Sequence, residues 1–200
     1  MQTTPQSTTN TQQGPAPSSH RGLVRNRHRP LYRLYKQDPS AAWITDGART
    51  SDAVATSTDP LHGELLIGTS HPLRAPLAMH KAVGGDHDGP NPGDYLSAAL
   101  AGCFDRTMRM VANRLDLPIV SLSVAVSAEV DVRGTLCVDP SVPVGFQKMV
   151  ITVDVCLADG IAPQALTMLL EATEHSCIVS QTLRGGVDIE VRCPSAPASP

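Results

Sequence analysis

Two cysteines stand where the spacing of apolar residues predicts the buried faces of two helices. Cys103 belongs to an apolar series that recurs every three or four residues between Leu96 and Val111, and Cys177 closes a similar series that begins at Leu166. Such spacing is typical of one face of an α-helix. If both faces pack on the same sheet, thiols 74 residues apart in the chain can meet. The pattern therefore permits a redox-active pair.

A packing role is the alternative for each thiol, because free cysteine is among the most buried residue types and behaves as a small hydrophobe. We accept that role for the other three cysteines, which fall in or beside predicted strands: Cys137, Cys156 and Cys193. Five cysteines without a Cys-x-x-Cys pair make neither a disulfide framework nor a standard zinc site. Any chemistry then comes from individual thiols.

A cation beside a thiol favours the reactive thiolate, because positive charge lowers the thiol pKa. Arg106 lies three residues after Cys103, and Arg109 follows at the next turn. Their spacing is equally consistent with a solvent-exposed edge of the helix. The residues alone leave both interpretations open.

The helix that carries Cys103 is predicted from about Pro92 to Leu115. Asn91 before Pro92 is a strong start signal, because Asn accepts a hydrogen bond from an unpaired amide and Pro loses nothing at the first helical position. A second helix is predicted to begin near Pro163 and to reach the second cysteine.

Alternating apolar and polar residues predict the strands. The alternation is strict over residues 122–132 and returns over 149–157, and weaker signals lie at 43–50, 63–69, 72–79 and 187–191. A sheet with one apolar face must be covered on that side, and the two helices are the available cover. The order of elements predicts an α+β fold.

Composition divides the chain into three parts. Residues 1–40 carry six Lys and Arg against one acid, a net charge of +5, so the chain's total of −3 leaves −8 for the rest. We expect residues 1–40 to be a disordered basic arm, residues 41–193 to form one domain, and residues 194–200 to be a short disordered tail.

Charge and hydropathy exclude several classes of function. An acidic body argues against nucleic acid as a partner. The longest mainly apolar stretch, residues 95–104, is about half of the roughly 20 residues that a membrane span needs, so we expect no membrane partner. The first residues lack the apolar segment of a secretory signal, and their prolines would break the amphipathic helix of an organellar transit peptide. We therefore expect a cytoplasmic location.

Two other kinds of site can be weighed in the loop before the first helix. The spacings of His71, His80 and His87 with Asp86 and Asp88 match no standard metal-ligand motif, so a solvated loop is the better interpretation. Backbone amides of the glycine-rich loop could hold an anion, but acidic residues crowd it and no P-loop lysine follows. We expect no metal site.

Residues 89–103 resemble the helix signature of the OsmC/Ohr family, the osmotically inducible and organic hydroperoxide resistance proteins. They contain its Gly-x-Asn-Pro turn, its Leu- and Ala-rich helix and its mid-helix cysteine, and residues 174–183 resemble the segment around the family's second cysteine. The resemblance covers roughly residues 60–193. It implies an OsmC-like fold, with two long central helices packed on antiparallel β-sheets in an intertwined homodimer that has active sites at the subunit interface.

The same resemblance implies a thiol peroxidase that reduces organic hydroperoxides to alcohols in the oxidative stress response. Cys103 matches the peroxidatic cysteine, whose thiolate attacks the peroxide and becomes a sulfenic acid, and Cys177 matches the resolving cysteine. An external dithiol, lipoyl-type in the family, would reduce the resulting disulfide, and no bound cofactor is implied. The alternative is an OsmC-fold protein that binds a small apolar ligand at the dimer interface without turning over peroxide.

Some positions depart from the family pattern. The best-studied hydroperoxide reductases carry Glu directly after the Asn-Pro turn, where this chain has Gly93, so Asp94, one place later, is the candidate substitute. Ser176-Cys177-Ile178 lacks the Cys-Pro of many relatives. The family's peroxidases also hold the thiolate with an Arg, and the candidates for a supporting cation here are Arg49, Arg74, Lys81 and Arg106.

Overall fold

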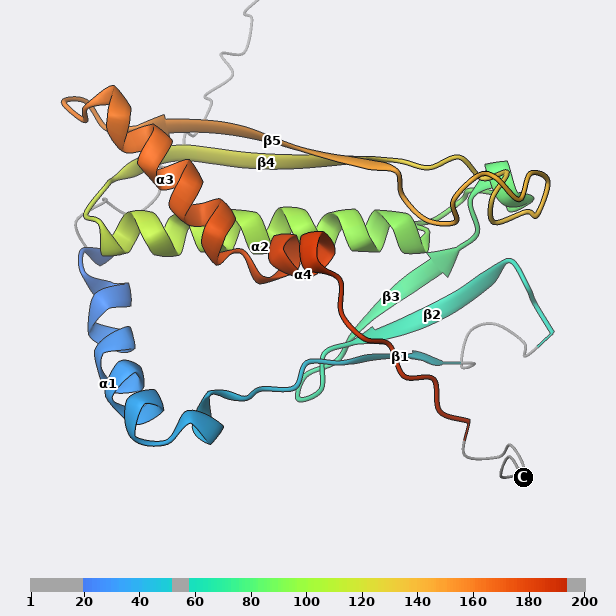
Figure 1. Ribbon diagram of the computed structural model, residues 1–200, viewed down its shortest axis with the longest axis horizontal. Helices are drawn as coiled ribbons and strands as arrows, with labels where there is room; N and C mark the ends of the chain where they lie inside the picture. The colour runs from blue at the N-terminus through green and yellow to red at the C-terminus, as the bar shows by residue number, and fades with distance from the viewer. Residues whose placement is uncertain (1–19, 52–57, 194–200) are drawn as a thin grey trace, which may run out of the picture.

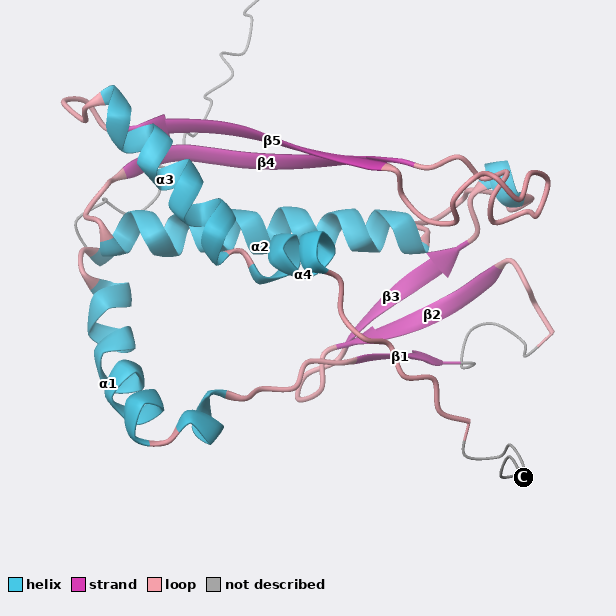
Figure 2. Ribbon diagram, viewed as in Figure 1, coloured by secondary structure: helices cyan, strands magenta, loops and turns pink. Residues whose placement is uncertain are grey.

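From the first strand to the third α-helix, the helices and strands follow one another in the order that apolar periodicity predicts, with one α-helix before them and another in place of a final strand (Figures 1 and 2). The computed structural model describes residues 20–51 and 58–193; residues 1–19, 52–57 and 194–200 are not described. The elements are α1 (Leu23–Gln37), η2 (Pro39–Ala42), β1 (Ala48–Ser51), β2 (His62–Ile67), β3 (Leu73–Ala78), η3 (Lys81–Val83), α2 (Pro92–Arg114), β4 (Ile119–Glu129), β5 (Lys148–Leu157), α3 (Pro163–Ser176) and α4 (Ile178–Gly185). The α+β prediction is confirmed.

The long helix α2 lies against the two-stranded antiparallel sheet β4–β5, and α3 crosses α2 on the way to α4 (Figure 1). Along β4, half-buried side chains alternate with exposed ones, as the strict alternation predicts. The core between the layers holds Met108, Val111 and Ala112 of α2 against Leu169 of α3. Burial of this apolar face supplies the main stabilisation, at about 25 cal/mol per Å² of apolar surface.

The asparagine before α2 fixes the start of this helix. The Asn91 side chain accepts hydrogen bonds from the amides of Gly93 (2.8 Å) and Asp94 (3.3 Å), and the Asp94 carboxylate accepts one from the Asn91 amide (2.9 Å). This is a capping box, which pairs amides that a helix otherwise leaves unsatisfied. The predicted start and end of α2 are both confirmed within one residue.

A second antiparallel sheet, in the order β1–β2–β3, lies below the N-terminal half of α2 in the view of Figure 1, and the end of β3 approaches the start of the helix. The Ala78 amide at the end of β3 donates to the Pro90 carbonyl (2.9 Å), and the Tyr95 hydroxyl donates to the Pro76 carbonyl. These contacts attach the small sheet to the first turn of α2.

Three expectations need correction in the described residues. Where a disordered arm was predicted, residues 23–37 form the helix α1. The second predicted helix divides at Cys177 into α3 and α4. Residues 187–191 form no strand, because their alternating apolar side chains have no neighbouring strand to pair with and remain exposed. The expected tail, residues 194–200, lies outside the described residues.

None of the helices in the described part of the chain is long and apolar enough to cross a bilayer.

The start of β2 is tied to the loop before α2 through a histidine. The His62 ring lies 3.1 Å from the Asp59 carboxylate and 3.2 Å from that of Asp88. The hydrogen bond with Asp59 raises the pKa of His62 above its ordinary value, and the nearby charge of Asp88 adds to the rise. Protonated His62 therefore stabilises this corner of the fold.

We expect stability to depend on pH through His62. Because its pKa is raised in the folded state, its contribution is complete below the unfolded value of about 6.5 and is lost as the pH rises through the folded value. His62→Gln should flatten the fall in melting temperature across this range. His71→Gln is the matched control, because the His71 ring has no ion pair among the described residues. An unchanged profile in His62→Gln would contradict the assignment.

Candidate active site

The fold brings Cys103 and Cys177 together. Cys103 lies in the middle of α2, and Cys177 is the single residue between α3 and α4. Both belong to one apolar cluster with Leu100 and Phe104, covered by side chains of β4 and β5. The two thiols are close enough to interact directly, and both are free. The juxtaposition that the helix spacing permitted is present within one chain.

The end of α3 presents the Cys177 side chain to α2. Cys177 has an extended backbone (φ −77°, ψ 106°), so the chain turns there and begins α4 at the next residue. Thr173, one turn earlier, is fully buried, and its hydroxyl donates to the Leu169 carbonyl (2.6 Å). The Cys177 side chain has no exposed surface. Sequence periodicity identified its burial, but a continuous helix was predicted instead of this break.

The environments of the two thiols differ. Burial raises the pKa of the Cys177 thiol, and the adjacent Cys103 thiol also contributes to the rise, while the backbone amides of Ser180 and Val179 act in the opposite direction. Cys103 is only half-buried. Since the thiolate is the nucleophile, Cys177 is the poorer attacking group at neutral pH, whereas Cys103 is accessible to a small molecule.

The two arginines after Cys103 are directed elsewhere. Arg106 bonds Asp105 (Nε to Oδ1, 2.8 Å), and Arg109 bonds both Asp105 (3.1 Å) and the Leu122 carbonyl (3.1 Å). Partial burial acts to raise the pKa of the Asp105 carboxyl. Hydrogen bonds from both arginines outweigh it and hold this pKa below its ordinary value. The prediction of a solvent-edge role for these side chains therefore fits the contacts better than that of a thiolate partner.

The other candidate cations lie on or just after the small sheet. Arg74 on β3 forms an ion pair with buried Glu64 on β2 (2.5 Å), while Arg49 on β1 and Lys81 in η3 are exposed. In Figure 1 this sheet diverges from α2 and approaches it near the helix N-terminus, whereas Cys103 is at mid-helix. Within one chain, the fold does not bring these three side chains to the thiols.

Asp94 is occupied in capping α2. Its carboxylate accepts hydrogen bonds from the Asn91 amide (2.9 Å) and side-chain nitrogen (2.6 Å). Nine residues separate it from Cys103 on the same helix, a rise of about 13 Å. Within one chain Asp94 therefore does not meet the thiol pair, and its observed role is structural.

The glycine after the Asn-Pro turn has a packing reason. A Cβ at Gly93 would lie 2.8 Å from the Phe146 ring and 3.0 Å from the Asn91 side-chain oxygen. The aromatic ring thus occupies the space that a larger residue at this position would need. This chain therefore has Gly in place of the family's Glu at a position where Phe146, from the long loop between β4 and β5, fills the adjoining space.

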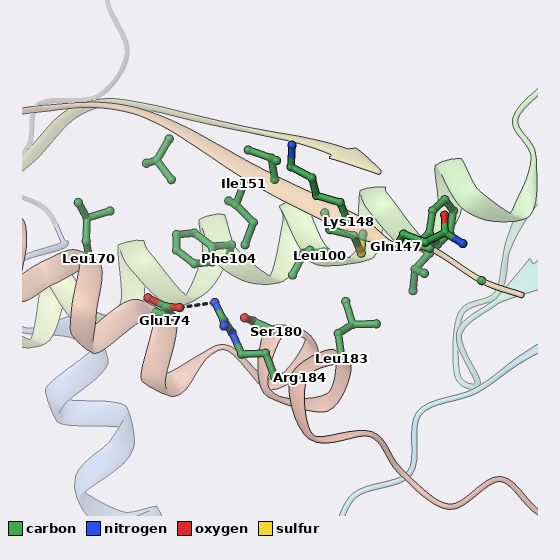
Figure 3. A pocket seen from close by; sticks show the side chains of 16 residues that line it. Leu100, Phe104, Gln147, Lys148, Ile151, Leu170, Glu174, Ser180, Leu183 and Arg184 are labelled. Carbon is green, nitrogen blue, oxygen red and sulfur yellow. Dashed lines mark hydrogen bonds and ion pairs between the residues drawn. The ribbon is translucent and has the colours of Figure 1, made fainter. Parts of the chain in front are cut away.

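A cavity of about 830 Å³ adjoins the thiol cluster (Figure 3). Leu100 and Phe104 belong to both, so one wall of the cavity is a wall of the thiol cluster. Glu174 and Arg184 form an ion pair at its edge, and Lys148 adds a further cation. Neither cysteine is among the lining residues. Sequence reasoning missed this cavity, because its lining comes mainly from α2, β5, α3 and α4, which only folding brings together.

Among the described residues, no three His, Cys, Asp or Glu side chains are grouped so that they could hold a metal ion. The His80 and His87 rings contact each other edge to face, with centroids 4.4 Å apart. Asp88 instead contacts His62.

Comparison with protein families gives one match, to the family described as OsmC-like protein, over residues 85–192. The chain belongs to this OsmC-like family. The matched region contains α2, β4, β5, α3 and α4, and therefore both thiols. α1 and the small sheet lie before it. No curated protein sequence matches the chain.

Solved structures support the same fold. An organic hydroperoxide resistance protein OsmC from Legionella pneumophila is 22% identical over 74% of this chain and 94% of its own, with a TM-score of 0.53. An OsmC-like protein of unknown function from Vibrio cholerae is 12% identical over 70% and 94%, with a TM-score of 0.55. An OsmC-like protein from Mycoplasma pneumoniae is 14% identical over 72% and 89%, with a TM-score of 0.53. At these identities the likeness establishes the fold.

The contact between Gly93 and Phe146 generates a stability prediction for this OsmC-family chain. Gly93→Ala should lower the free energy of unfolding by about 1 kcal/mol, because overpacking of 1–3 kcal/mol exceeds the helix-propensity gain of about 1 kcal/mol. Gly102→Ala is the matched control on the same helix, since nothing lies within 4 Å of its Cβ position, and it should stabilise. Equal effects of the two substitutions in urea unfolding would refute the packing argument.

The unequal environments of the thiols predict unequal alkylation. In the native protein at neutral pH, iodoacetamide should modify Cys103 well before Cys177, because Cys177 is buried and its pKa is raised. In denaturant the two rates should become equal. Mass spectrometry of digested, quenched samples resolves each site from the exposed cysteines. Comparable native rates at both sites would contradict the assigned environments.

Proposed function

We propose that this protein is a thiol peroxidase that reduces organic hydroperoxides to alcohols. The observation that carries the proposal is the direct approach of half-exposed Cys103 to fully buried Cys177 in one apolar cluster. Two thiols so placed can form a disulfide without the help of another protein. Family membership and the fold shared with an organic hydroperoxide resistance protein support the same chemistry.

In the proposed cycle the Cys103 thiolate attacks the terminal oxygen of ROOH. The O–O bond breaks, the alkoxide takes a proton and leaves as ROH, and Cys103 becomes a sulfenic acid. The Cys177 sulfur then attacks the Cys103 sulfur, which forms the disulfide and releases water. An external dithiol, of lipoyl type, reduces the disulfide by exchange and is itself oxidised to a disulfide. Each turn therefore consumes two electrons and two protons, and no bound cofactor takes part.

The apolar surroundings favour an organic peroxide over hydrogen peroxide. Leu100 and Phe104 form a shared wall between the thiol cluster and the adjoining cavity. An alkyl group that enters along this wall leaves water, which contributes about 0.8 kcal/mol per buried CH₂. Hydrogen peroxide has no such group to bury.

We also infer that the protein works as a homodimer in the cytoplasm. Within one chain neither Asp94 nor any of the candidate cations Arg49, Arg74 and Lys81 meets the thiols, so a partner subunit is the source of any such group. The exposed apolar side chains of residues 187–191 agree with a surface that a second subunit covers. A peroxidatic thiolate assisted by a cation therefore requires the dimer.

The second candidate function is binding of a small apolar ligand without peroxide turnover. One observation favours it: the cavity adjoins the thiol cluster, but neither cysteine lines it. A ligand could therefore occupy the cavity without touching sulfur. In that case both thiols are packing residues, and their substitution leaves ligand affinity intact.

Substitution of the two thiols tests the peroxidase. Cys103→Ser should reduce the rate of cumene hydroperoxide consumption by on the order of a thousandfold, because a serine hydroxyl supplies no nucleophile at neutral pH. Cys177→Ser should permit the first attack and then stall, leaving a sulfenic acid on Cys103 that dimedone labels. The measurement is stopped-flow peroxide consumption, followed by mass spectrometry of the modified cysteine.

Cys156→Ser is the matched control, because Cys156 is an exposed cysteine on β5, and it should react as the wild type does. Wild-type rates in both Cys103→Ser and Cys177→Ser would exclude the peroxidase and leave the binding function. Full turnover in Cys177→Ser alone would mean that an external thiol resolves the sulfenic acid.

A further inference from the structure

Residues 23–47, called here the N-terminal strap, are ordered but bury none of their side chains. The strap consists of α1, η2 and the segment that leads to β1, and it lies before the region that matches the family. Its exposed large apolar side chains are Leu23, Leu31, Tyr32, Leu34, Trp43 and Ile44, of which Trp43 is 87% and Ile44 73% exposed. An apolar surface of this kind marks an interaction site.

The strap is fixed to the body at both ends. At its start, the Val24 amide donates to the Asn113 side chain (2.9 Å), and Arg25 bonds both the Arg114 carbonyl and the Asp116 carboxylate (2.9 Å each). At its end, the chain enters β1, which pairs with β2. Between these points α1 leads away from the C-terminal end of α2 (Figure 1). The strap is thus held in place while its apolar side chains remain uncovered.

α1 by itself is a poor helix. It contains Pro30, and it carries Arg25, Arg29 and Arg33 at successive spacings of four residues with no acid among its residues. Proline removes a hydrogen bond in the helix interior, and like charges four residues apart repel. Both features indicate that an anionic and partly apolar surface outside this chain stabilises the helix.

Two surfaces could stabilise α1 in this way, an anionic membrane and a second copy of this chain, and the charge of the body favours the second. Residues 1–40 sum to +5 and residues 41–200 to −8. An anionic membrane would attract the strap but repel the body, whereas a second copy of this chain offers an acidic body to each strap. Trp43 and Ile44 also lie outside the helix, on the segment toward β1, so the uncovered apolar surface is not a single helix face of the kind that lies on a bilayer.

We propose that each N-terminal strap docks on the acidic body of the second copy in the homodimer. This proposal rests on the homodimer inferred above and adds an interface outside the family's matched region. In a dimer with twofold symmetry each substitution in the strap acts twice. Arg29, Arg33 and Lys36 form no ion pair within the described residues, so they are available to the partner's carboxylates.

Substitutions in the full-length chain test the strap. Leu31→Ser/Leu34→Ser and Arg33→Glu should each raise the dimer dissociation constant about tenfold or more in analytical ultracentrifugation. Arg133→Glu, an exposed residue in the loop between β4 and β5, makes the same change in net charge as Arg33→Glu and should leave the constant within about twofold. Because Leu31, Arg33 and Leu34 are all exposed in their own subunit, circular dichroism should report an unchanged fold.

The outcomes distinguish failure of the strap proposal from failure of the homodimer. If wild type is monomeric at all concentrations, the homodimer itself fails, and the strap proposal with it. If wild type and every variant dimerise equally, the homodimer stands and the strap proposal is overturned. Flotation of the full-length protein with vesicles of phosphatidylcholine and phosphatidylglycerol, lost in Arg33→Glu while dimerisation is unchanged, would assign the strap to an anionic membrane and also overturn the proposal.

Discussion

The contact between Cys103 and Cys177 depends on how tightly the end of α3 is held against α2. Cys177 has no exposed surface, and it lies at the point where α3 stops and α4 starts. Thr173 and Leu169, one and two turns earlier on α3, are equally buried. The packing that stabilises the domain therefore also fixes the position of its second thiol, so the site cannot be loosened without cost to the fold.

The arginines that follow Cys103 in the sequence do not act as its cationic neighbours in the structure. The cations closest to Cys103 along α2, Arg106 and Arg109, share the carboxylate of Asp105, and Arg74 is paired with Glu64. Within one chain, the two thiols consequently differ in their burial. Cys177 is buried, which raises its pKa, whereas Cys103 is only half-buried and remains accessible. If Arg49, Arg74 or Lys81 assists the thiolate, as the family resemblance implies, that residue would belong to the partner subunit, which links the proposed chemistry to the proposed homodimer.

The chain combines a region that matches the family, residues 85–192, with an N-terminal strap that precedes it. The domain provides a buried thiol pair and an adjoining cavity lined in part by Leu100 and Phe104. The N-terminal strap provides ordered apolar and basic surface that its own subunit does not use. The proposed homodimer would use both parts. The partner subunit would supply the charged groups that do not reach the thiols within one chain, and it would also supply the surface on which the strap docks.

The sequence by itself determined the features that follow from local rules. The Asn91-Pro92 start of α2, the alternation along β4 and the burial of Cys177 were all predictable, because capping chemistry and apolar periodicity depend on neighbours along the chain. The motif around Cys103 was sufficient to identify the family. Tertiary structure decided the rest. The hydrogen bond from Arg109 to the Leu122 carbonyl, the Phe146 ring above Gly93 and the break at Cys177 each depend on residues or elements brought together only by folding. The helix in the arm was missed for the opposite reason: its basic, proline-containing sequence has weak local preference for helix, and contacts with Asn113 and Asp116 hold its first turn in place.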